Sequence, residues 1–404
     1  MSAQPAITPD FKPSRLGDVE AAKRHHDPAL VDRIIAATYA SDDPADALVA
    51  RFSQLPGGAG WRMLDTALSH GIDAVDDAPA ELAPVLAGAV TTPDWVDLDL
   101  VDKGTVAWWR VGGPLQLLAL TSGSLAYGYS TSFARPLLMT GRLKQMAPRR
   151  LGETANWVVT ATRPGGLRPG AKGLHDTVRI RLVHALVRKH LLSTGEWDVP
   201  NWGVPMSIAD TMATGTIGFF LYPVRGLQDF GVRFSNDELE AITHLWMYIN
   251  FLMGVPREEL PTSFAEAEAW GDAASELEDV DIEDAHLLVD SLLFDGLAYD
   301  RVLPKPIAQA ARVSVGHGMA AVARHWMGDP LADDLRIPNT QMRRIIPVLR
   351  ALISFRERMR AAGLAPSDER VVAFEMWAGD RVMKLAGTKP AINPTDAAKK
   401  PALA

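Results

Sequence analysis

The sequence contains no cysteine among its 404 residues. This absence excludes disulfide bonds, thiolate zinc sites, iron–sulfur clusters and cysteine nucleophiles, and it also excludes haem that is ligated by a thiolate or attached covalently. Any metal in this protein must therefore be bound by His, Asp, Glu, Lys, Tyr or Met side chains.

A concentrated positive charge is also missing. The formal net charge is −8, and no long block of Lys and Arg precedes the last residues. Proteins that bind a phosphate backbone usually carry a basic patch. We therefore expect no nucleic-acid partner.

Long apolar runs are absent as well. The most apolar stretch, residues 114–120, is far shorter than the roughly 20 residues that a membrane-spanning helix needs, so we expect no transmembrane segment. Residues 1–13 have neither a basic start followed by an apolar core nor a twin-arginine pattern, and we expect a cytoplasmic protein.

Helical patterns dominate what is present. Apolar residues recur at helical spacing over residues 30–39, 238–253 and 342–362, whereas the alternation typical of strands hardly appears. We predict an all-α fold with a single large multi-helix domain over residues 29–386. An extended N-terminal arm over 1–28 and a flexible tail over 387–404 are expected on either side, because both are rich in proline or polar residues. Two interleaved helical bundles are the alternative.

The most informative segment is a predicted helix over residues 174–192, with Asp176 as its cap and Gly195 just beyond its end. On a helical wheel His184 has Ile180 and Val187 on one side, and Arg181 and Arg188 on the other. An imidazole suits haem iron, an apolar face suits the porphyrin, and two guanidiniums suit its propionates. The alternative is a hydrogen-bonded core histidine whose neighbouring arginines pair with ordinary carboxylates.

The preceding segment, residues 148–162, predicts a helix that begins with a proline in its first turn. Arg150, Thr154 and Trp157 share one face, and Glu153 lies beside them. A carboxylate, a hydroxyl and a guanidinium together can deliver protons and stabilise a reacting oxygen. The alternative is a surface pair of Arg150 with Glu153 and a threonine that packs against another helix.

Several motifs occur in an order that resembles the family of latex-clearing proteins (rubber oxygenases) and MpaB-type oxygenases. The resemblance covers roughly residues 90–270. Its motifs are Thr140-Gly-Arg-Leu143, Arg181-x-x-His184-x-x-x-Arg188, Gly203-x-Pro205 followed by Asp210 and Thr214, and His244-x-Trp246 leading into Gly254-Val-Pro256 and Pro261.

The resemblance implies a helical domain that encloses a non-covalent haem b, with His184 as the proximal iron ligand and Arg181 and Arg188 near the cofactor. It also implies O₂ as co-substrate and an apolar, often isoprenoid, substrate. No electron donor is indicated by these residues.

One position departs from the rubber-cleaving members, whose distal side resembles this sequence at Arg150 and Thr154 but carries a lysine where Glu153 stands here. A lysine there can close the sixth coordination site, whereas a glutamate is a poor ligand for ferrous haem and a better proton-transfer group. We expect Glu153 to act as the distal acid/base. The absence of an export signal favours a small intracellular hydrophobe, an isoprenoid or another alkene or aromatic, over extracellular rubber.

Three other functions are alternatives. A carboxylate-bridged di-iron oxygenase needs two Glu-x-x-His pairs, and Glu283-x-x-His286 supplies one. A phosphohydrolase built on His175 and Asp176 lacks a convincing set of His and Asp partners. A non-catalytic helical ligand carrier would be colourless. The other histidines, including His244, are expected to have structural or solvated roles.

Overall fold

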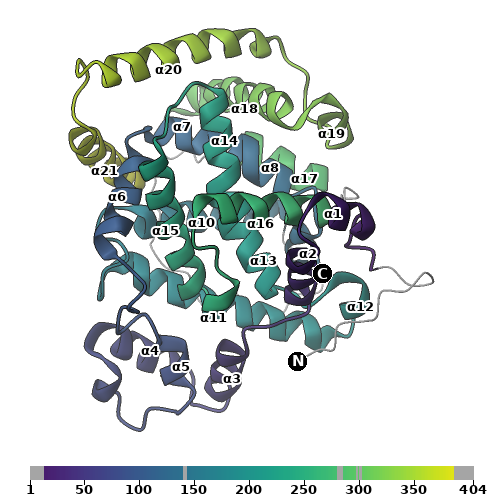
Figure 1. The fold of residues 1–404 in the computed structure, drawn as a ribbon, viewed down its shortest axis with the longest axis vertical. Helices are drawn as coiled ribbons and strands as arrows, with labels where there is room; N and C mark the ends of the chain where they lie inside the picture. The colour runs from purple at the N-terminus through teal and green to yellow at the C-terminus, as the bar shows by residue number, and fades with distance from the viewer. Residues whose placement is uncertain (1–12, 140–142, 280–284, 297–298, 300–302, 386–404) are drawn as a thin grey trace.

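Helix α15 (Asn236–Leu252) packs along helix α6 (Leu98–Trp109), and the two form one side of the molecule in Figure 1. A Cβ at Gly104 would overlap the carbonyl of Ala241, so the close crossing of the helices requires glycine there. The computed structural model describes residues 13–139, 143–279, 285–296, 299 and 303–385. Ser235 and Glu238 form a capping box at the start of α15, as its sequence predicts.

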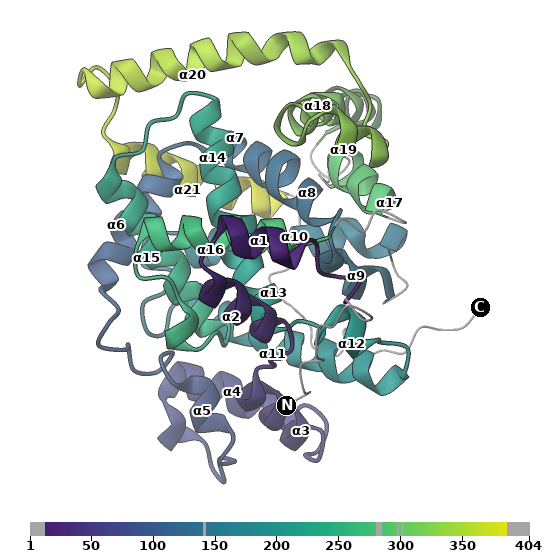
Figure 2. The same cartoon turned by 45° about the vertical axis from the view of Figure 1, so that its right-hand side comes forward.

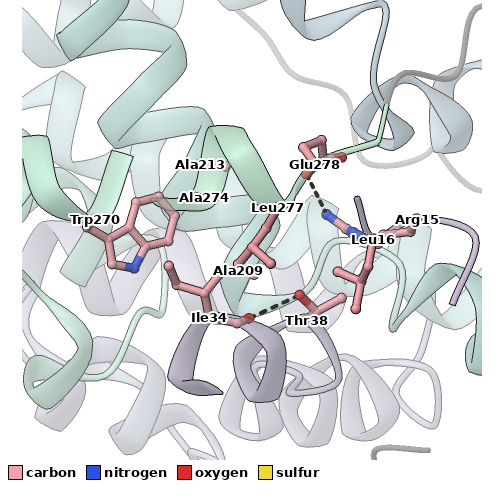
Figure 3. A pocket seen from close by; sticks show the side chains of 10 residues that line it. All are labelled: Arg15, Leu16, Ile34, Thr38, Ala209, Ala213, Trp270, Ala274, Leu277 and Glu278. Atoms are coloured by element: carbon pink, nitrogen blue, oxygen red, sulfur yellow. Dashed lines mark hydrogen bonds and ion pairs between the residues drawn. The ribbon is translucent and has the colours of Figure 1, made fainter. Parts of the chain in front are cut away.

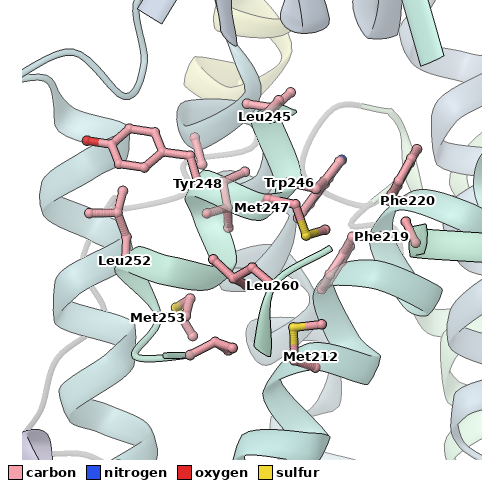
Figure 4. Close-up of a cluster of buried hydrophobic side chains, with 14 of the residues drawn as sticks. Met212, Phe219, Phe220, Leu245, Trp246, Met247, Tyr248, Leu252, Met253 and Leu260 are labelled. Atoms are coloured by element: carbon pink, nitrogen blue, oxygen red, sulfur yellow. The ribbon is translucent and has the colours of Figure 1, made fainter. Parts of the chain in front are cut away.

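The main core is aromatic where three helical segments meet (Figure 4). Trp246 of α15 is fully buried and stacks on Phe219, with ring centroids 5.5 Å apart. Trp157 contacts both rings edge-on, at 5.5 Å from Phe219 and 6.4 Å from Trp246. Aromatic contacts of this kind add to the area that they bury, and they fix how the three segments sit against each other.

The N-terminal helices cover one end and one side of this core (Figure 1). Their bounds are α1 (Val19–His25), α2 (Pro28–Thr38), α3 (Asp43–Phe52), α4 (Ala59–His70), the 3₁₀ turn η1 (Ile72–Ala74) and α5 (Leu82–Leu86).

The central part of the chain supplies the inner helices. After α6 these are α7 (Gly113–Leu118), η2 (Ala119–Leu125), α8 (Ala126–Gly128), η3 (Ser132–Ala134), α9 (Arg135–Met139), α10 (Leu143–Thr162), α11 (Lys172–Thr194), α12 (Val199–Trp202), α13 (Ile208–Met212), η4 (Ala213–Leu221), α14 (Tyr222–Asp229), then α15, η5 (Arg257–Glu259) and α16 (Phe264–Leu277).

The C-terminal helices cover the opposite end of the molecule from α3, α4 and α5, as Figures 1 and 2 show. Their bounds are α17 (Ala285–Asp290), η6 (Ser291–Asp295), α18 (Lys305–Met327), α19 (Asp329–Asp334), η8 (Gln341–Ile345), α20 (Ile346–Ala361) and α21 (Asp368–Leu385).

Segments of π-helix interrupt three helices among the described residues. They are η2 after α7, η4 after α13 and η6 after α17, and η2 contacts both of the others. A π-helical turn is less stable than an α-helical one and is often found at functional sites. The inner helices are therefore irregular where they approach one another.

The all-α prediction is confirmed: the described residues form no β-sheet and only two isolated bridges. The prediction of an extended arm is wrong for residues 19–25, which form α1. Asp18 accepts a hydrogen bond from the Ala21 amide at 2.9 Å, and Ala22 is buried, so a cap and a core contact stabilise this short helix. Residues 1–12 and 386–404 lie outside the described residues, and for them the arm and the tail stay predictions.

Two predicted helix starts also differ from the structure. Residues 341–345 form a 3₁₀ turn, and the α-helix predicted from 342 begins at Ile346, with Pro347 in its first turn. The helix predicted from Pro148 begins earlier, at Leu143. Among the described helices, none is both long enough and apolar enough to cross a membrane.

Candidate functional site

His184 lies in the middle of α11 and is half-buried. Burial and, to a smaller extent, the positive charge of Arg188 together lower the pKa of its imidazole to about 4, against the opposing effect of Asp210 and Asp42. Neither ring nitrogen makes a hydrogen bond within the part of the chain that the structure describes. His184 therefore has the neutral imidazole that a metal ligand needs, and its role as a ligand stays a prediction.

The ends of α11 agree in part with the sequence. Gly195 ends the helix with a φ of 73°, as predicted. The helix begins at Lys172 and not after Asp176, so Asp176 is not its cap. The Asp176 carboxylate pairs with Lys172 and accepts a hydrogen bond from Thr160 of α10 at 3.0 Å.

Arg181 is buried in an ion pair with Asp42. Its Nε and Nη2 donate to the two carboxylate oxygens at 2.6 and 2.8 Å, and its Nη1 donates to the carbonyl of Val85 at 3.2 Å. Both side chains are only 7% exposed. The planar guanidinium is thus held on both sides by groups of this chain.

Arg188, two turns further along α11, is engaged in the same way. Its Nε donates to Asp46 at 2.9 Å and its Nη1 donates to the carbonyl of Met206 at 2.6 Å. Asp42 and Asp46 are one turn apart at the start of α3, which lets them meet two arginines on one side of α11. Both arginines thus pair with carboxylates at the start of α3, and the contact with cofactor propionates that the sequence predicts for them stays a prediction.

Gly254 packs directly on the first of these ion pairs. Its φ is 100°, and a Cβ at this position would overlap the Asp42 carboxylate and lie 2.8 Å from Nε of Arg181. Only glycine adopts this conformation easily and leaves the space free. The Gly254-Val255-Pro256 motif thus has a structural role beside α11.

Helices α10 and α11 are antiparallel neighbours, joined by a hydrogen bond in which Trp157 Nε1 donates to Thr177 Oγ1 at 2.9 Å. Arg150 lies two turns before Trp157, and His184 lies two turns after Thr177.

The structure describes only some of the distal residues that the sequence predicts. Glu153 and Thr154 occur between Trp157 and Arg150 on α10, and both side chains are half-buried. The side chain of Arg150 lies outside the described residues, as do residues 140–142 of the motif that precedes it. The structure describes Glu153 and Thr154 as half-buried residues of α10, and their predicted chemistry stays a proposal.

The residues around His184 fit a flat, largely apolar metal ligand. The imidazole is neutral and makes no hydrogen bond to a described residue, and Ile180 and Val187 beside it are half-buried. Haem suits this combination of a nitrogen donor and apolar surroundings.

A buried charge cluster lies beside a small cavity between α2, α13 and α16 (Figure 3). Arg15 Nη2 donates to Asp210 at 2.6 Å and contacts Glu278 at 3.5 Å. Burial raises the pKa of Glu278. Asp210 also forms the capping box of α13 with Ser207, so Arg15 ties the start of the described chain to the helix that follows α12.

Other candidates from the sequence have structural roles. His175 Nε2 contacts the carbonyl of Leu68 at 2.9 Å, and His244 Nε2 accepts from the amide of Asp97 at 3.0 Å. His286 contacts Arg336, and its predicted partner Glu283 lies outside the described residues. The described residues contain no group of three His, Asp or Glu side chains placed to hold a metal ion.

Sequence reasoning missed Asp42, Asp46 and Arg15. The spacing of Asp42 and Asp46 at the start of a predicted helix was the available signal, but two acidic residues there are typical of any helix N-terminus. Their partners on α11 are 139 and 142 residues away in the chain.

Comparison with known proteins gives consistent results. The family model described as "ER-bound oxygenase mpaB/B'/Rubber oxygenase, catalytic domain" matches residues 109–361. A rubber oxygenase from Streptomyces sp. (strain K30) is 27% identical over 221 residues, which are 52% of this chain and 50% of the relative, so the chain spans about half the length of that relative. A solved structure of latex clearing protein LCP in the closed state has a TM-score of 0.60 at 20% identity, over 84% of this chain and 91% of that chain.

Proposed function

This chain belongs to the family of MpaB and rubber oxygenase catalytic domains, and on that premise we propose that it is a haem b-dependent oxygenase that uses O₂ on a hydrophobic substrate. Membership of the family makes it an oxygenase, an oxidoreductase. The cofactor, the substrate and the residues that serve them are the proposal.

The observation that carries the proposal is the state of His184. A metal ligand must offer an unprotonated nitrogen, and the depressed pKa of this imidazole keeps it unprotonated throughout the physiological range. Haem, when bound, supplies the iron at which O₂ is activated. We assign His184 as the proximal ligand.

Arg181 and Arg188 act as positioning residues in this proposal. Their ion pairs with Asp42 and Asp46 hold one side of α11 against α3, and His184 lies between them on the same helix. Two ion pairs on either side of the ligand limit rotation of the helix about its axis. We therefore assign them the orientation of His184, and their contact with the cofactor, predicted from the sequence, stays a prediction.

Glu153, Thr154 and Arg150 are proposed to serve the oxygen side. The carboxyl of Glu153 would give and take the proton, while the Thr154 hydroxyl and the Arg150 guanidinium would donate hydrogen bonds to the oxygen. A small hydrophobe, an isoprenoid or another alkene or aromatic, is the proposed substrate class, and the cytoplasm is the proposed location.

The first test is an absorption spectrum of the protein purified from cells supplied with hemin, with pyridine haemochrome analysis. We expect a Soret band and about one haem b per chain in the wild type, and loss of most of both in His184→Ala. His190→Ala is the matched control, because His190 is exposed on the same helix, and it should keep the wild-type spectrum. A colourless wild type would contradict the proposal and favour the carrier, or the di-iron enzyme if iron is present without a Soret band.

A second test addresses Glu153. Glu153→Gln keeps the shape of the side chain but cannot carry the proton, and loss of one general acid/base usually lowers the rate by 10²- to 10⁴-fold. Oxygen uptake and product formation by the haem-loaded variant measure the effect on alkene substrates that the wild type turns over. Unchanged turnover with an unchanged haem content would remove Glu153 from the site while leaving His184 in it.

A further inference from the structure

Helix α20 lies across one end of the molecule, with no other element beyond it in either view (Figures 1 and 2). Its inward face is firmly attached. Ile346 and Ile353 are buried, and Glu357, 3% exposed, pairs with Arg110 at 3.4 Å. Arg356 Nη1 donates to the carbonyl of Val111 at 2.7 Å. The orientation of α20 about its own axis is therefore set by the body of the protein.

The outward face of α20 is apolar. Val348, Leu352 and Phe355 are 56%, 61% and 59% exposed, and their spacing of four and three residues puts them on one stripe. A helix on the surface of a soluble domain normally presents polar side chains on this face. Here the helix has one apolar face toward the core and a second toward the outside.

Exposed apolar side chains continue into the following segment. Leu364, Phe374 and Trp377 are 69%, 60% and 55% exposed. Within the described part of the chain, only one other large apolar side chain, that of Ile307, is more than half exposed. The concentration between residues 348 and 377 is therefore a property of this end of the molecule. An exposed apolar stripe such as the one on α20 marks an interaction site.

Positive charge accompanies the stripe. Residues 343–381 contain eight arginines and five acidic residues, whereas the whole chain has a net charge of −8. Arg344 and Arg358 flank the stripe, are exposed, and form no ion pair with any residue that the structure describes. Arg381 lies over the ring of Trp377 at 5.2 Å.

We propose that the α20 surface, defined as Val348, Leu352, Phe355, Arg344 and Arg358, docks on an anionic phospholipid membrane. A helix with an apolar stripe and flanking arginines lies in the membrane interface, with the stripe between the lipid head groups and the arginines on anionic lipids.

Charge complementarity favours lipid over a second copy of the chain. In a two-fold pair the α20 surface faces itself, so its arginines would meet only the apolar side chains and the arginines of the same surface in the other copy. A lipid leaflet offers apolar chains and negative charge together. This docking goes beyond the proposed function and does not depend on haem, but it would bring the enzyme to the phase in which a hydrophobic substrate dissolves.

The test is flotation of the full-length protein, as purified, with vesicles of phosphatidylcholine alone or mixed with phosphatidylserine. We expect binding to the mixed vesicles at low salt, weaker binding at high salt and little to phosphatidylcholine alone. The variant pair Leu352→Glu with Phe355→Glu should weaken binding by roughly 10-fold or more, because each side chain loses its apolar insertion. Arg344→Ser with Arg358→Ser should weaken it by roughly 10-fold or more.

Matched controls use the same changes elsewhere. Leu192→Glu changes an exposed leucine of α11, and Arg62→Ser changes an exposed arginine of α4, which lies at the opposite end of the molecule in Figure 1. Both should bind vesicles like the wild type. No binding to the mixed vesicles, or equal binding by wild type and both α20 variants, would overturn the proposal. A dimer in solution that Leu352→Glu dissociates, with no vesicle binding, would overturn it in favour of a second copy.

A labelled variant keeps the test valid if the charged variants fold poorly. Because the chain has no cysteine, Leu352→Cys provides one reactive thiol for an environment-sensitive fluorophore. We expect a blue shift and brighter emission on the mixed vesicles, and no change for the same label at Leu192→Cys. Equal responses at the two positions would contradict docking through α20.

Discussion

Helices α11 and α20 break the usual rule of burial in opposite directions. In α11 the polar side chains Arg181, Arg188 and His184 point into the protein, while in α20 the apolar side chains Leu352 and Phe355 point out of it. Buried polar groups and exposed apolar groups are both costly unless something compensates for them. We therefore infer that the buried polar face of α11 and the exposed apolar face of α20 each have a function.

The arginines in these two regions differ in burial and in pairing. Those of α11 are buried and paired with Asp42 and Asp46, so they stabilise a geometry. Arg344 of η8 and Arg358 of α20 are exposed and have no acidic partner among the described residues, so their charge is available to an outside partner. The same residue type serves internal positioning in one helix and external recognition in the other.

The largest expected effect comes from Asp42→Ala. Removing this carboxylate leaves the guanidinium of Arg181 buried without a counter-charge, which usually costs about 3–5 kcal/mol of stability. Urea unfolding of the wild type and the variant measures the difference. Asp46→Ala should cost less, because the side chain of Asp46 is 34% exposed and water can replace part of what Arg188 loses.

A compensating change separates the charge from the packing in this experiment. Adding Arg181→Met to Asp42→Ala removes the unpaired charge and should recover part of the lost stability. If Asp42→Ala alone costs less than about 1 kcal/mol, the contrast between the two sets of arginines fails.

The pH dependence of haem binding should show an effect of intermediate size. A proton competes with iron for the lone pair of His184, and burial lowers the pKa of this imidazole from 6.5 to about 4. The His184-dependent Soret band should therefore stay constant from about pH 8 to about pH 5 and decline only toward pH 4.

An unshifted imidazole would behave differently, because its affinity for iron would fall about tenfold for each pH unit below 6.5. Absorption spectra across this range, with far-UV circular dichroism to show that the fold persists, distinguish the two cases. A midpoint close to 6.5 would mean that His184 is exposed to water and is not buried beside Arg188.

The smallest expected effect is that of Arg344→Ser with Arg358→Ser on stability. Because both side chains are exposed and unpaired within the described structure, the unfolding free energy should change by about 0.5 kcal/mol or less. Urea unfolding beside Asp42→Ala completes the comparison. A loss above about 2 kcal/mol would show that these arginines stabilise the fold, and it would weaken their assignment to lipid.

Much of the fold could be predicted from local patterns. The helical character, the capping box before α15 and the end of α11 at Gly195 all follow from residues close together in the chain. The prediction for residues 19–25 failed because the packing of Ala22 into the core is a long-range contact. The family resemblance seen over residues 90–270 extends further, since the family match reaches residue 361.

Of the candidate site, only the position of His184 could be predicted from the sequence. The wheel position of His184 between an apolar and a cationic side is a property of its own helix, and the structure adds that the imidazole is half-buried, neutral and without a hydrogen bond to the described residues. The partners of Arg181 and Arg188 could not be predicted, because the sequence alone did not distinguish a propionate from a carboxylate of α3.

The sequence by itself determined which segments are helices and which side chains share a face, because those properties repeat over the few residues of one helical turn. Tertiary structure alone decided which face each helix buries. Asp42 meets Arg181 across 139 residues of chain, and α20 turns Ile353 inward and Leu352 outward although the two are neighbours of similar hydrophobicity. Burial depends on what the rest of the chain places against a helix, and no single segment contains that information.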